Sequence, residues 1–236
     1  MTGRLDLIIG PMFAGKTGEF IRLYRRYKSI GKDILVINHS SDERYGKGVV
    51  SSHNKDQIKC VSMPDFSDIC CDDRYIKADI IMIDEGQFFN GLIEFVVNGI
   101  DLDNKHFIVS GLSGDCFRKP FGEILNLIPY CTNIKHMKSL CNICMEDGVE
   151  TEAIYSMRKI ADTTQQVVGS GDIYLPVCHR HYNISYFDES DVCKPVSPKK
   201  SNKQIRKPEK VISTNKTRND KDVIHDTASE WMLWGC

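Results

Sequence analysis

The sequence lacks the features of a membrane protein, a repeat protein or a strongly charged nucleic-acid-binding protein. No apolar run approaches the length needed to cross a bilayer. The 31 Lys and Arg residues nearly balance the 32 Asp and Glu residues, so no global field favours nucleic acid or a membrane surface. No internal repeat of solenoid length occurs. The first residues lead straight into an apolar stretch and leave no room for a signal peptide, so we expect a cytoplasmic protein.

Cysteine is plentiful, with ten residues, but disulfides are not expected in the cytoplasm. Metal binding explains four metal-type residues better, because they fall in two pairs, Cys141-Asn142-Ile143-Cys144 and Cys178-His179-Arg180-His181. Each pair can approach one ion from a tight turn, which predicts a tetrahedral zinc site of Cys141, Cys144, Cys178 and His181. His181 is preferred to His179 because its spacing from Cys178 mirrors the first pair. Four protein ligands leave no open position, so this zinc is expected to be structural.

A phosphate-binding loop is predicted near the N-terminus. The segment Gly10-Pro11-Met12-Phe13-Ala14-Gly15-Lys16-Thr17 fits the P-loop pattern G-x-x-x-x-G-K-[ST]. An apolar run of strand length precedes it, and residues at helical spacing follow it. In this arrangement backbone N–H groups and the helix N-terminus surround phosphate oxygens. Lys16 can then reach the β- and γ-phosphates, and the Thr17 hydroxyl can ligate Mg²⁺.

An acidic pair completes the predicted phosphate site. Residues 78–84 read as a buried strand that ends in Asp84, a Walker B pattern whose carboxylate would hold Mg²⁺. Glu85 follows directly and would activate water in an ATPase, or accept a proton from a substrate hydroxyl in a kinase. A GTPase is disfavoured because both Asn-Lys dipeptides break the Asn-Lys-x-Asp pattern of guanine sites. A hydrolysing ATPase remains open on the two Walker motifs alone.

The spacing of apolar segments predicts an α/β fold with a mainly parallel, RecA-like twisted sheet. Strands are expected at residues 5–9, 33–38, 78–84 and 106–112, with a short strand at 58–61. Helices are expected after the P-loop and at 65–71 and 88–98. In such sheets ligands lie beyond the carboxyl ends of the strands, where Gly10, Asn38, Asp84 and Gly111 fall.

The chain changes character twice along its length. We predict a P-loop domain over residues 1–140 and a small zinc-binding lobe over 141–187. The tail over 188–236 is polar and basic, and it has too little apolar surface to fold alone. Trp231 and Trp234 lie in this tail and are costly to expose to water, so we expect them to dock on a partner or a neighbouring subunit.

Taken together, these motifs resemble the thymidine kinase family of the cellular and poxvirus-like type, which contains zinc. The resemblance covers residues 1 to about 187 and keeps the family's order and spacing. It includes Asp42-Glu43-Arg44-Tyr45, Asp84-Glu85-Gly86-Gln87-Phe88-Phe89 and Arg118-Lys119-Pro120-Phe121-Gly122. The second and third of these strings are far more specific than the P-loop.

The resemblance implies transfer of the ATP γ-phosphoryl group to the 5′-hydroxyl of thymidine, with deoxyuridine as second substrate. Glu85 would be the general base, and Thr17 with Asp84 would hold Mg²⁺. It also implies a lasso-like loop in the zinc lobe that closes over the base, assembly as a tetramer and feedback by dTTP. The residues expected to bind ATP are Gly10, Pro11, Met12, Phe13, Ala14, Gly15, Lys16, Thr17, Asp42, Glu43, Arg44, Asp84 and Gln87. Those expected to bind the nucleoside are Met12, Phe88, Leu112, Cys116, Phe121, Ser156, Gln165, Gln166, Val167, Val168, Gly169 and Tyr174, with Phe117 beside Cys116.

The departures from the family pattern fall on the nucleoside side. Cys116 stands where the family has a pocket aromatic, and Phe117 follows one residue later. Either Phe117 turns into the same space or the pocket is more open. Ser156 stands where threonine is frequent, and Gln165 replaces a usual apolar residue. The alternative function, a zinc-bearing P-loop ATPase that binds nucleic acid, would not need the segments at 117–122 and 165–174.

Overall fold

The computed structural model describes residues 2–42, 48–52, 54–67, 69–159 and 173–187. The described residues belong to one compact unit. The tail with its two tryptophans lies outside the described residues, and so do residues 165–169 of the predicted lasso-like loop, whereas Tyr174 is described. In the described part, no helix combines the length and the apolar character needed to cross a bilayer.

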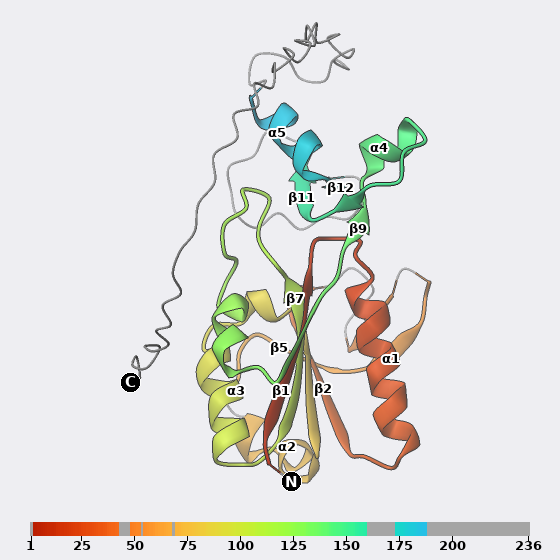
Figure 1. Ribbon diagram of the computed structural model, residues 1–236. Helices are drawn as coiled ribbons and strands as arrows, with labels where there is room; N and C mark the ends of the chain where they lie inside the picture. The colour runs from red at the N-terminus through yellow and green to blue at the C-terminus, as the bar shows by residue number, and fades with distance from the viewer. Residues whose placement is uncertain (1, 43–47, 53, 68, 160–172, 188–236) are drawn as a thin grey trace, which may run out of the picture. The chain divides into compact units, whose positions relative to one another are not determined.

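A six-stranded sheet forms the centre of this unit (Figure 1). Its strand order is β5-β2-β6-β7-β1-β8, and every neighbouring pair is parallel. The strands are β1 (Arg4–Gly10), β2 (Ile34–His39), β5 (Val61–Met63), β6 (Ile80–Asp84), β7 (His106–Leu112) and β8 (Asn133–His136). The predicted parallel sheet is therefore confirmed, and the predicted fourth strand matches β7.

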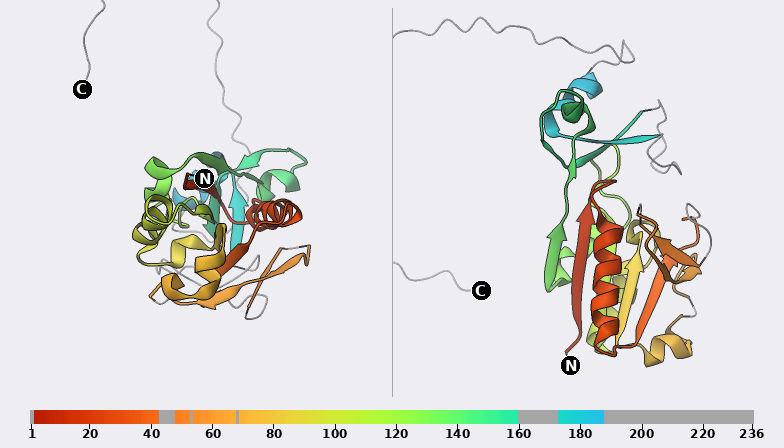
Figure 2. Two further views of the ribbon diagram at one scale, coloured as in Figure 1. Left: turned by 90° about the horizontal axis from the view of Figure 1, so that it is seen from below. Right: turned by 90° about the vertical axis from the view of Figure 1, so that its right-hand side faces the viewer.

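Helices cover both faces of the sheet, which Figure 1 and the view from below in Figure 2 show. Leu5, Leu7 and Ile9 of β1 pack in one core with Leu92 and Val96 of α3 (Leu92–Asp101). Ile8, between Leu7 and Ile9, packs on the other face with Phe20 and Ile21 of α1 (Lys16–Ser29). Alternate residues of a strand point to opposite faces, so a strand buried on both sides reads as a continuous apolar run. The helices are α1 (Lys16–Ser29), α2 (Asp73–Lys77) and α3 (Leu92–Asp101), with 3₁₀ turns η1 (Ile69–Cys71), η2 (Gly86–Phe88) and η3 (Ile124–Tyr130).

Three local predictions were inaccurate. The predicted strand at 58–61 is split at Cys60, because β4 (Gln57–Lys59) pairs with β3 (Val49–Ser51) in a hairpin while β5 joins the sheet. The predicted helix at 65–71 is instead η1 followed by α2, which Asp72 caps through its side chain. The predicted helix at 88–98 begins only at Leu92, because Gly91 adopts a left-handed conformation in front of it.

A small lobe follows the sheet and has its own core. Its elements are β9 (Ser139–Leu140), α4 (Asn142–Glu146), β10 (Glu152–Ala153), β11 (Tyr155–Arg158), β12 (Tyr174–Val177) and α5 (His179–Phe187). Two short antiparallel pairs, β9 with β10 and β11 with β12, hold it together. Its buried cluster contains three cysteines, Ala153, Val177 and Tyr182. So few apolar side chains make a weak core, which is typical of a lobe that a metal stabilises.

Candidate active site

The P-loop lies between β1 and α1, as predicted. Gly15 adopts a left-handed conformation with φ of 78° immediately before α1, which glycine does without steric cost. Gly15 occupies the N-cap position of α1 and has no side chain with which to cap the helix, and a helix N-terminus of this kind suits an anion. Lys16 Nζ donates to the Pro11 carbonyl at 2.8 Å, across the loop. A small movement would transfer this ammonium from the carbonyl to a phosphate oxygen.

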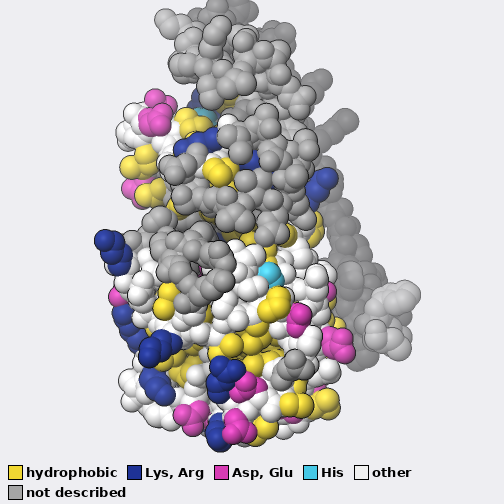
Figure 3. Space-filling view, turned by 180° about the vertical axis from the view of Figure 1, so that it is seen from behind, with side chains coloured by type: hydrophobic (Ala, Val, Ile, Leu, Met, Phe, Trp, Pro, Cys, Tyr) yellow, Lys and Arg dark blue, Asp and Glu magenta, His cyan; other side chains and the backbone are white. Residues whose placement is uncertain are grey.

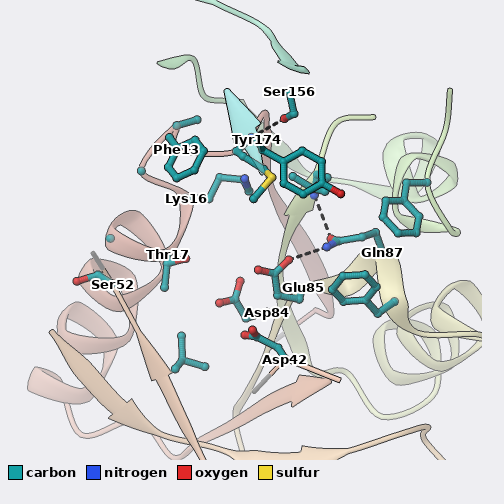
Figure 4. Close-up of a pocket in the computed structure, with 18 of the residues that line it drawn as sticks. Phe13, Lys16, Thr17, Asp42, Ser52, Asp84, Glu85, Gln87, Ser156 and Tyr174 are labelled. Carbon is teal, nitrogen blue, oxygen red and sulfur yellow. Dashed lines mark hydrogen bonds between the residues drawn. The ribbon is translucent and has the colours of Figure 1, made fainter. Parts of the chain in front are cut away.

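An acidic cluster lies at the carboxyl ends of β2 and β6. Asn38 and Asp84 are neighbours in the register of these two strands, and the Asn38 amide donates to Asp42 at 3.1 Å. Figure 4 shows Asp84, Glu85 and Asp42 together, across the cavity from Thr17. Burial, and then the negative charge of Glu85, raise the pKa of Asp84 well above its ordinary value. A buried carboxylate of this kind, with hydroxyl and carboxylate oxygens near it, suits a hard cation such as Mg²⁺.

Glu85 has an unusual backbone conformation. Its φ of 52° places it in the left-handed region, which non-glycine residues seldom adopt. The turn that follows Asp84 therefore reverses at once into η2 and brings Gln87 beside Glu85. The Gln87 amide donates to the Glu85 carboxylate at 2.6 Å and accepts from the Leu112 backbone N–H at 3.0 Å (Figure 4).

One cavity of about 390 Å³ joins the loop, the acids and the small lobe. It takes in the predicted ATP-binding residues Met12, Phe13, Ala14, Gly15, Lys16, Thr17, Asp42, Asp84 and Gln87, together with Glu85. It also takes in the predicted nucleoside-binding residues Phe88, Leu112, Cys116, Phe121, Ser156 and Tyr174. Gly10 and Pro11, at the start of the loop, are not among the residues that line the cavity. Glu43, Arg44 and residues 165–169 lie outside the described residues.

The four predicted zinc ligands meet in the small lobe. Their ligand atoms all lie within 4.8 Å of one another. His181 Nδ1 lies 3.3 to 3.5 Å from the three cysteine Sγ atoms, and Cys144 Sγ lies 3.9 Å from Cys178 Sγ. Zinc–sulfur bonds of about 2.3 Å and zinc–nitrogen bonds of about 2.0 Å in a tetrahedron give ligand separations of roughly 3.5 to 3.8 Å. The group could therefore hold Zn²⁺, and His179 points elsewhere, with Nδ1 3.1 Å from the Tyr155 hydroxyl.

Comparison with known proteins decides the family. A sequence model described as thymidine kinase matches residues 3–182. The chain belongs to the thymidine kinase family.

Relatives in the thymidine kinase family include proteins of plants and poxviruses. Thymidine kinase a of Arabidopsis thaliana is 36% identical over 184 residues, which cover 77% of this chain and 75% of the relative. The thymidine kinase of Yaba monkey tumor virus (strain VR587) is 38% identical over 181 residues, or 77% of this chain and 95% of the relative. The thymidine kinase of Vaccinia virus (strain Western Reserve) is 36% identical over 180 residues, which cover 76% of this chain and 97% of the relative. Membership of this family supports the kinase interpretation and gives no support to the nucleic-acid-binding ATPase.

The small lobe and the P-loop domain of this family member are connected at the cavity. Ser156 is buried on β11, and its hydroxyl accepts a hydrogen bond from the Met12 N–H at 2.8 Å. Tyr174, at the start of β12, lines the same cavity and accepts from Arg158 at 3.0 Å. On the other wall, the Tyr182 hydroxyl donates to the Cys116 carbonyl at 2.7 Å. The lobe thus reaches both the loop at Met12 and the wall segment at Cys116.

The departure from the family pattern at positions 116 and 117 has a structural outcome. Cys116 is buried in the cavity wall. Phe117 does not line the cavity among the described residues, and its ring lies 5.8 Å from the Arg158 guanidinium carbon. The arrangement in which Phe117 turns into the pocket is therefore not the one that the described residues show.

Sequence reasoning did not anticipate one wall of the cavity. The β3–β4 hairpin contributes Val50, Ser51, Ser52, Asn54 and Asp56. Its strands have three residues each, too few for an alternating pattern to stand out. The available signal was the polar turn between two short β-branched runs.

Proposed function

We propose that this chain acts as an ATP-dependent thymidine kinase, which transfers the ATP γ-phosphoryl group to the 5′-hydroxyl of thymidine and gives dTMP and ADP. The observation that carries the proposal is the shared cavity. The P-loop, Glu85 and the lobe residues Ser156 and Tyr174 all line it, so a donor and an acceptor can meet there. A hydrolase needs no second organic pocket beside its phosphate loop.

On the donor side, we propose that the loop amides and Lys16 bind the ATP phosphates. The N-terminus of α1 adds its partial positive charge at the same place. Lys16 would exchange the Pro11 carbonyl for a β- or γ-phosphate oxygen. Of the further predicted ATP-binding residues, Asp42 lines the cavity, and Glu43 and Arg44 stay predictions because they lie outside the described residues.

We propose that Thr17 and Asp84 hold Mg²⁺, with Asp42 close by. When bound, the ion would neutralise charge on the transferring phosphoryl group. The chain's own contribution is a buried carboxylate at the end of β6 that favours a cation beside it.

Glu85 is the proposed general base. Its carboxylate would accept the proton of the 5′-hydroxyl as that oxygen forms its bond to the γ-phosphorus. The bond from the γ-phosphorus to the ADP oxygen then breaks, and ADP leaves with the electron pair. Most of the acceleration in such reactions comes from position and charge, so the fixed site of Glu85 matters more than its strength as a base.

For the nucleoside, we propose a pocket formed by Met12, Leu112, Cys116, Phe121 and Tyr174. Figure 4 shows Tyr174 and Ser156 on the lobe side of the cavity, opposite Asp84 and Glu85. The Phe121 ring packs edge-on against Phe88, with centroids 5.4 Å apart, which fixes this wall. A small apolar pocket would exclude purines by shape and accept deoxyuridine as second substrate.

Further proposals rest on the resemblance and on the lobe. A structural Zn²⁺ on Cys141, Cys144, Cys178 and His181 fits the geometry of that group. Assembly as a homotetramer and inhibition by dTTP are family expectations, and residues 1–140 and 141–187 are proposed as separate domains. A cytoplasmic setting is proposed as well, and the eight cysteines in the described residues form no disulfide. Basic and acidic side chains are mixed on the coloured part of the face in Figure 3. This mixture is not the continuous basic patch that a nucleic-acid-binding surface needs.

A nucleoside panel tests the proposed function. ADP release is measured with ATP and Mg²⁺ and each of thymidine, deoxyuridine, deoxycytidine and deoxyguanosine, with single-stranded DNA as a further arm. Thymidine is expected to give the highest kcat/KM, deoxyuridine to follow, and the others to give background rates. ADP release that ignores thymidine and rises with DNA would overturn the proposal.

A further inference from the structure

The Gln87 side chain is buried beside the proposed base and has a polar partner at each end. Only 2% of the residue is exposed. Its Oε1 accepts from the Leu112 backbone N–H at 3.0 Å, and its Nε2 donates to Glu85 Oε2 at 2.6 Å. A backbone N–H can only donate, so the oxygen end of the amide must face Leu112. The nitrogen end must then face Glu85.

The surrounding glycines leave room for this arrangement and for little else. A Cβ at Gly111 would collide with Gln87 Oε1, and one at Gly122 would collide with the Gln87 backbone carbonyl. Gly86, one residue earlier, lies so close to β7 that a Cβ there would be 2.9 Å from Val109 Cγ1. The turn that carries Gln87 is therefore packed directly against the end of β7. In this packed turn, the two hydrogen bonds to Leu112 and Glu85 fix the position of the Gln87 side-chain amide.

We propose that Gln87 is a positioning residue for the proposed reaction, and that it holds the Glu85 carboxylate where it can accept the proton of the substrate hydroxyl. A glutamate side chain has three rotatable bonds, so its carboxylate can take many positions. A displacement of a catalytic group by about 1 Å can lower the rate about 100-fold. The Gln87 amide occupies one acceptor position of Oε2, and an ionised carboxylate has further acceptor positions on its two oxygens. The inference rests on the proposed role of Glu85 as base.

The same amide connects the base to the nucleoside wall. Leu112 lines the cavity, and its backbone N–H donates to Gln87. Gln87 thereby connects the orientation of Glu85 to the end of β7, against which the nucleoside is proposed to lie. Gln87 was expected to bind ATP, but both of its polar atoms have protein partners. The two roles differ in what they predict for KM and kcat.

Gln87→Met and Gln87→Asn separate these roles. Methionine keeps the length of the side chain and loses the donor, whereas asparagine keeps the amide but is too short to reach both partners. Both variants are expected to lower kcat for thymidine about 100-fold. The KM values for ATP and thymidine should change by less than about threefold. Asp6→Asn is the control that separates a loss of fold stability from a loss of catalysis. Asp6 lies toward the end of β1 that is remote from the P-loop, so a change there should not alter the site directly.

Each outcome decides something. A kcat loss with both KM values kept, in either variant, supports the positioning role. A rise in the KM for ATP at unchanged kcat would make Gln87 an ATP ligand and overturn the inference. Wild-type kcat in Gln87→Asn, which should fold even if the methionine variant does not, would also overturn it. If the unaltered chain does not phosphorylate thymidine, the proposed function fails, and that result is distinct because it needs no variant.

Discussion

The Ser156 hydroxyl accepts a hydrogen bond from the Met12 backbone N–H at 2.8 Å, although 144 positions separate the two residues in the chain. Met12 belongs to the loop that would hold the donor phosphates, and Ser156 belongs to the small lobe that would cover the acceptor. Both residues line the cavity, and Ser156 is buried. The contact fixes the distance between the two halves of the proposed site.

Ser156→Ala removes this acceptor and leaves the Met12 N–H without its partner. Met12 is half-buried, so leaving this donor unsatisfied should cost about 1 kcal/mol, the lower end of the range for buried groups. We expect the KM for thymidine to rise about fivefold or more, with a smaller change in the KM for ATP, in steady-state assays. Ser29→Ala, at the exposed end of α1, is the matched control and should leave both values unchanged. Equal effects on the two KM values would contradict the placement of Ser156 on the nucleoside side.

Cys178→Ser tests the metal group. We expect zinc content measured on the purified protein to fall from about one ion per chain to well below half, because serine is a poor zinc ligand. The melting temperature should fall as well, since metal binding contributes to folding of a lobe with a small core. The KM for thymidine should rise more than that for ATP, because β11 and β12 carry Ser156 and Tyr174.

The control for this variant is Cys71→Ser, which changes an exposed thiol outside the lobe. It should retain zinc, melting temperature and both KM values. Full zinc content in the Cys178→Ser protein would contradict the proposal that Cys178 is one of the zinc ligands.

Asp6 provides a pH-dependent contribution to stability that is remote from the site. It accepts hydrogen bonds from His106 and Asn133, each at 2.8 Å. Burial raises its pKa, but these hydrogen bonds and the neighbouring positive charges outweigh burial, so its pKa is lowered overall. A lowered carboxyl pKa stabilises the fold above the unfolded-state pKa, and the contribution is lost as pH falls through the folded-state value.

Asp6→Asn should therefore lower the free energy of unfolding at pH 7 by about 1–2 kcal/mol, with the difference from the unaltered chain shrinking below about pH 4. Urea unfolding followed by circular dichroism at several pH values measures this. Asp101→Asn, at an exposed position, should show no such difference. A destabilisation that persists unchanged to pH 3 would mean that packing, not charge, is the cause.

The features that the sequence predicted well are those with a strong local pattern. The strand ending in Asp84 is buried on both faces, so it reads as an unbroken apolar run followed by an acid. The choice of His181 over His179 came from spacing alone, and the structure groups His181 with the three cysteines. In each case the signal lies within a few residues of the chain, in the apolar run before Asp84 and in the three-residue spacing of Cys178 and His181.

What could not be predicted depends on tertiary contacts. All four residues of β8 are exposed, so no apolar pattern marks it, and it is recognisable only by its pairing with β1. The bond between Gln87 and Glu85 depends on the left-handed conformation at Glu85, for which a glutamate gives no signal. The hydrogen bond between Met12 and Ser156 joins segments whose approach no local pattern encodes.

The role of Glu85 in proton transfer is the central claim, and product formation by Glu85→Gln tests it most directly. Radiolabelled thymidine is incubated with ATP and Mg²⁺, and dTMP and ADP are quantified together, with Glu94→Gln on the partly exposed α3 as control. The unaltered chain and the control should give one dTMP for each ADP, and Glu85→Gln should be slower by roughly 10²- to 10⁴-fold while it still binds ATP. ADP without dTMP from the unaltered chain, or near-normal dTMP formation by Glu85→Gln, would contradict the account.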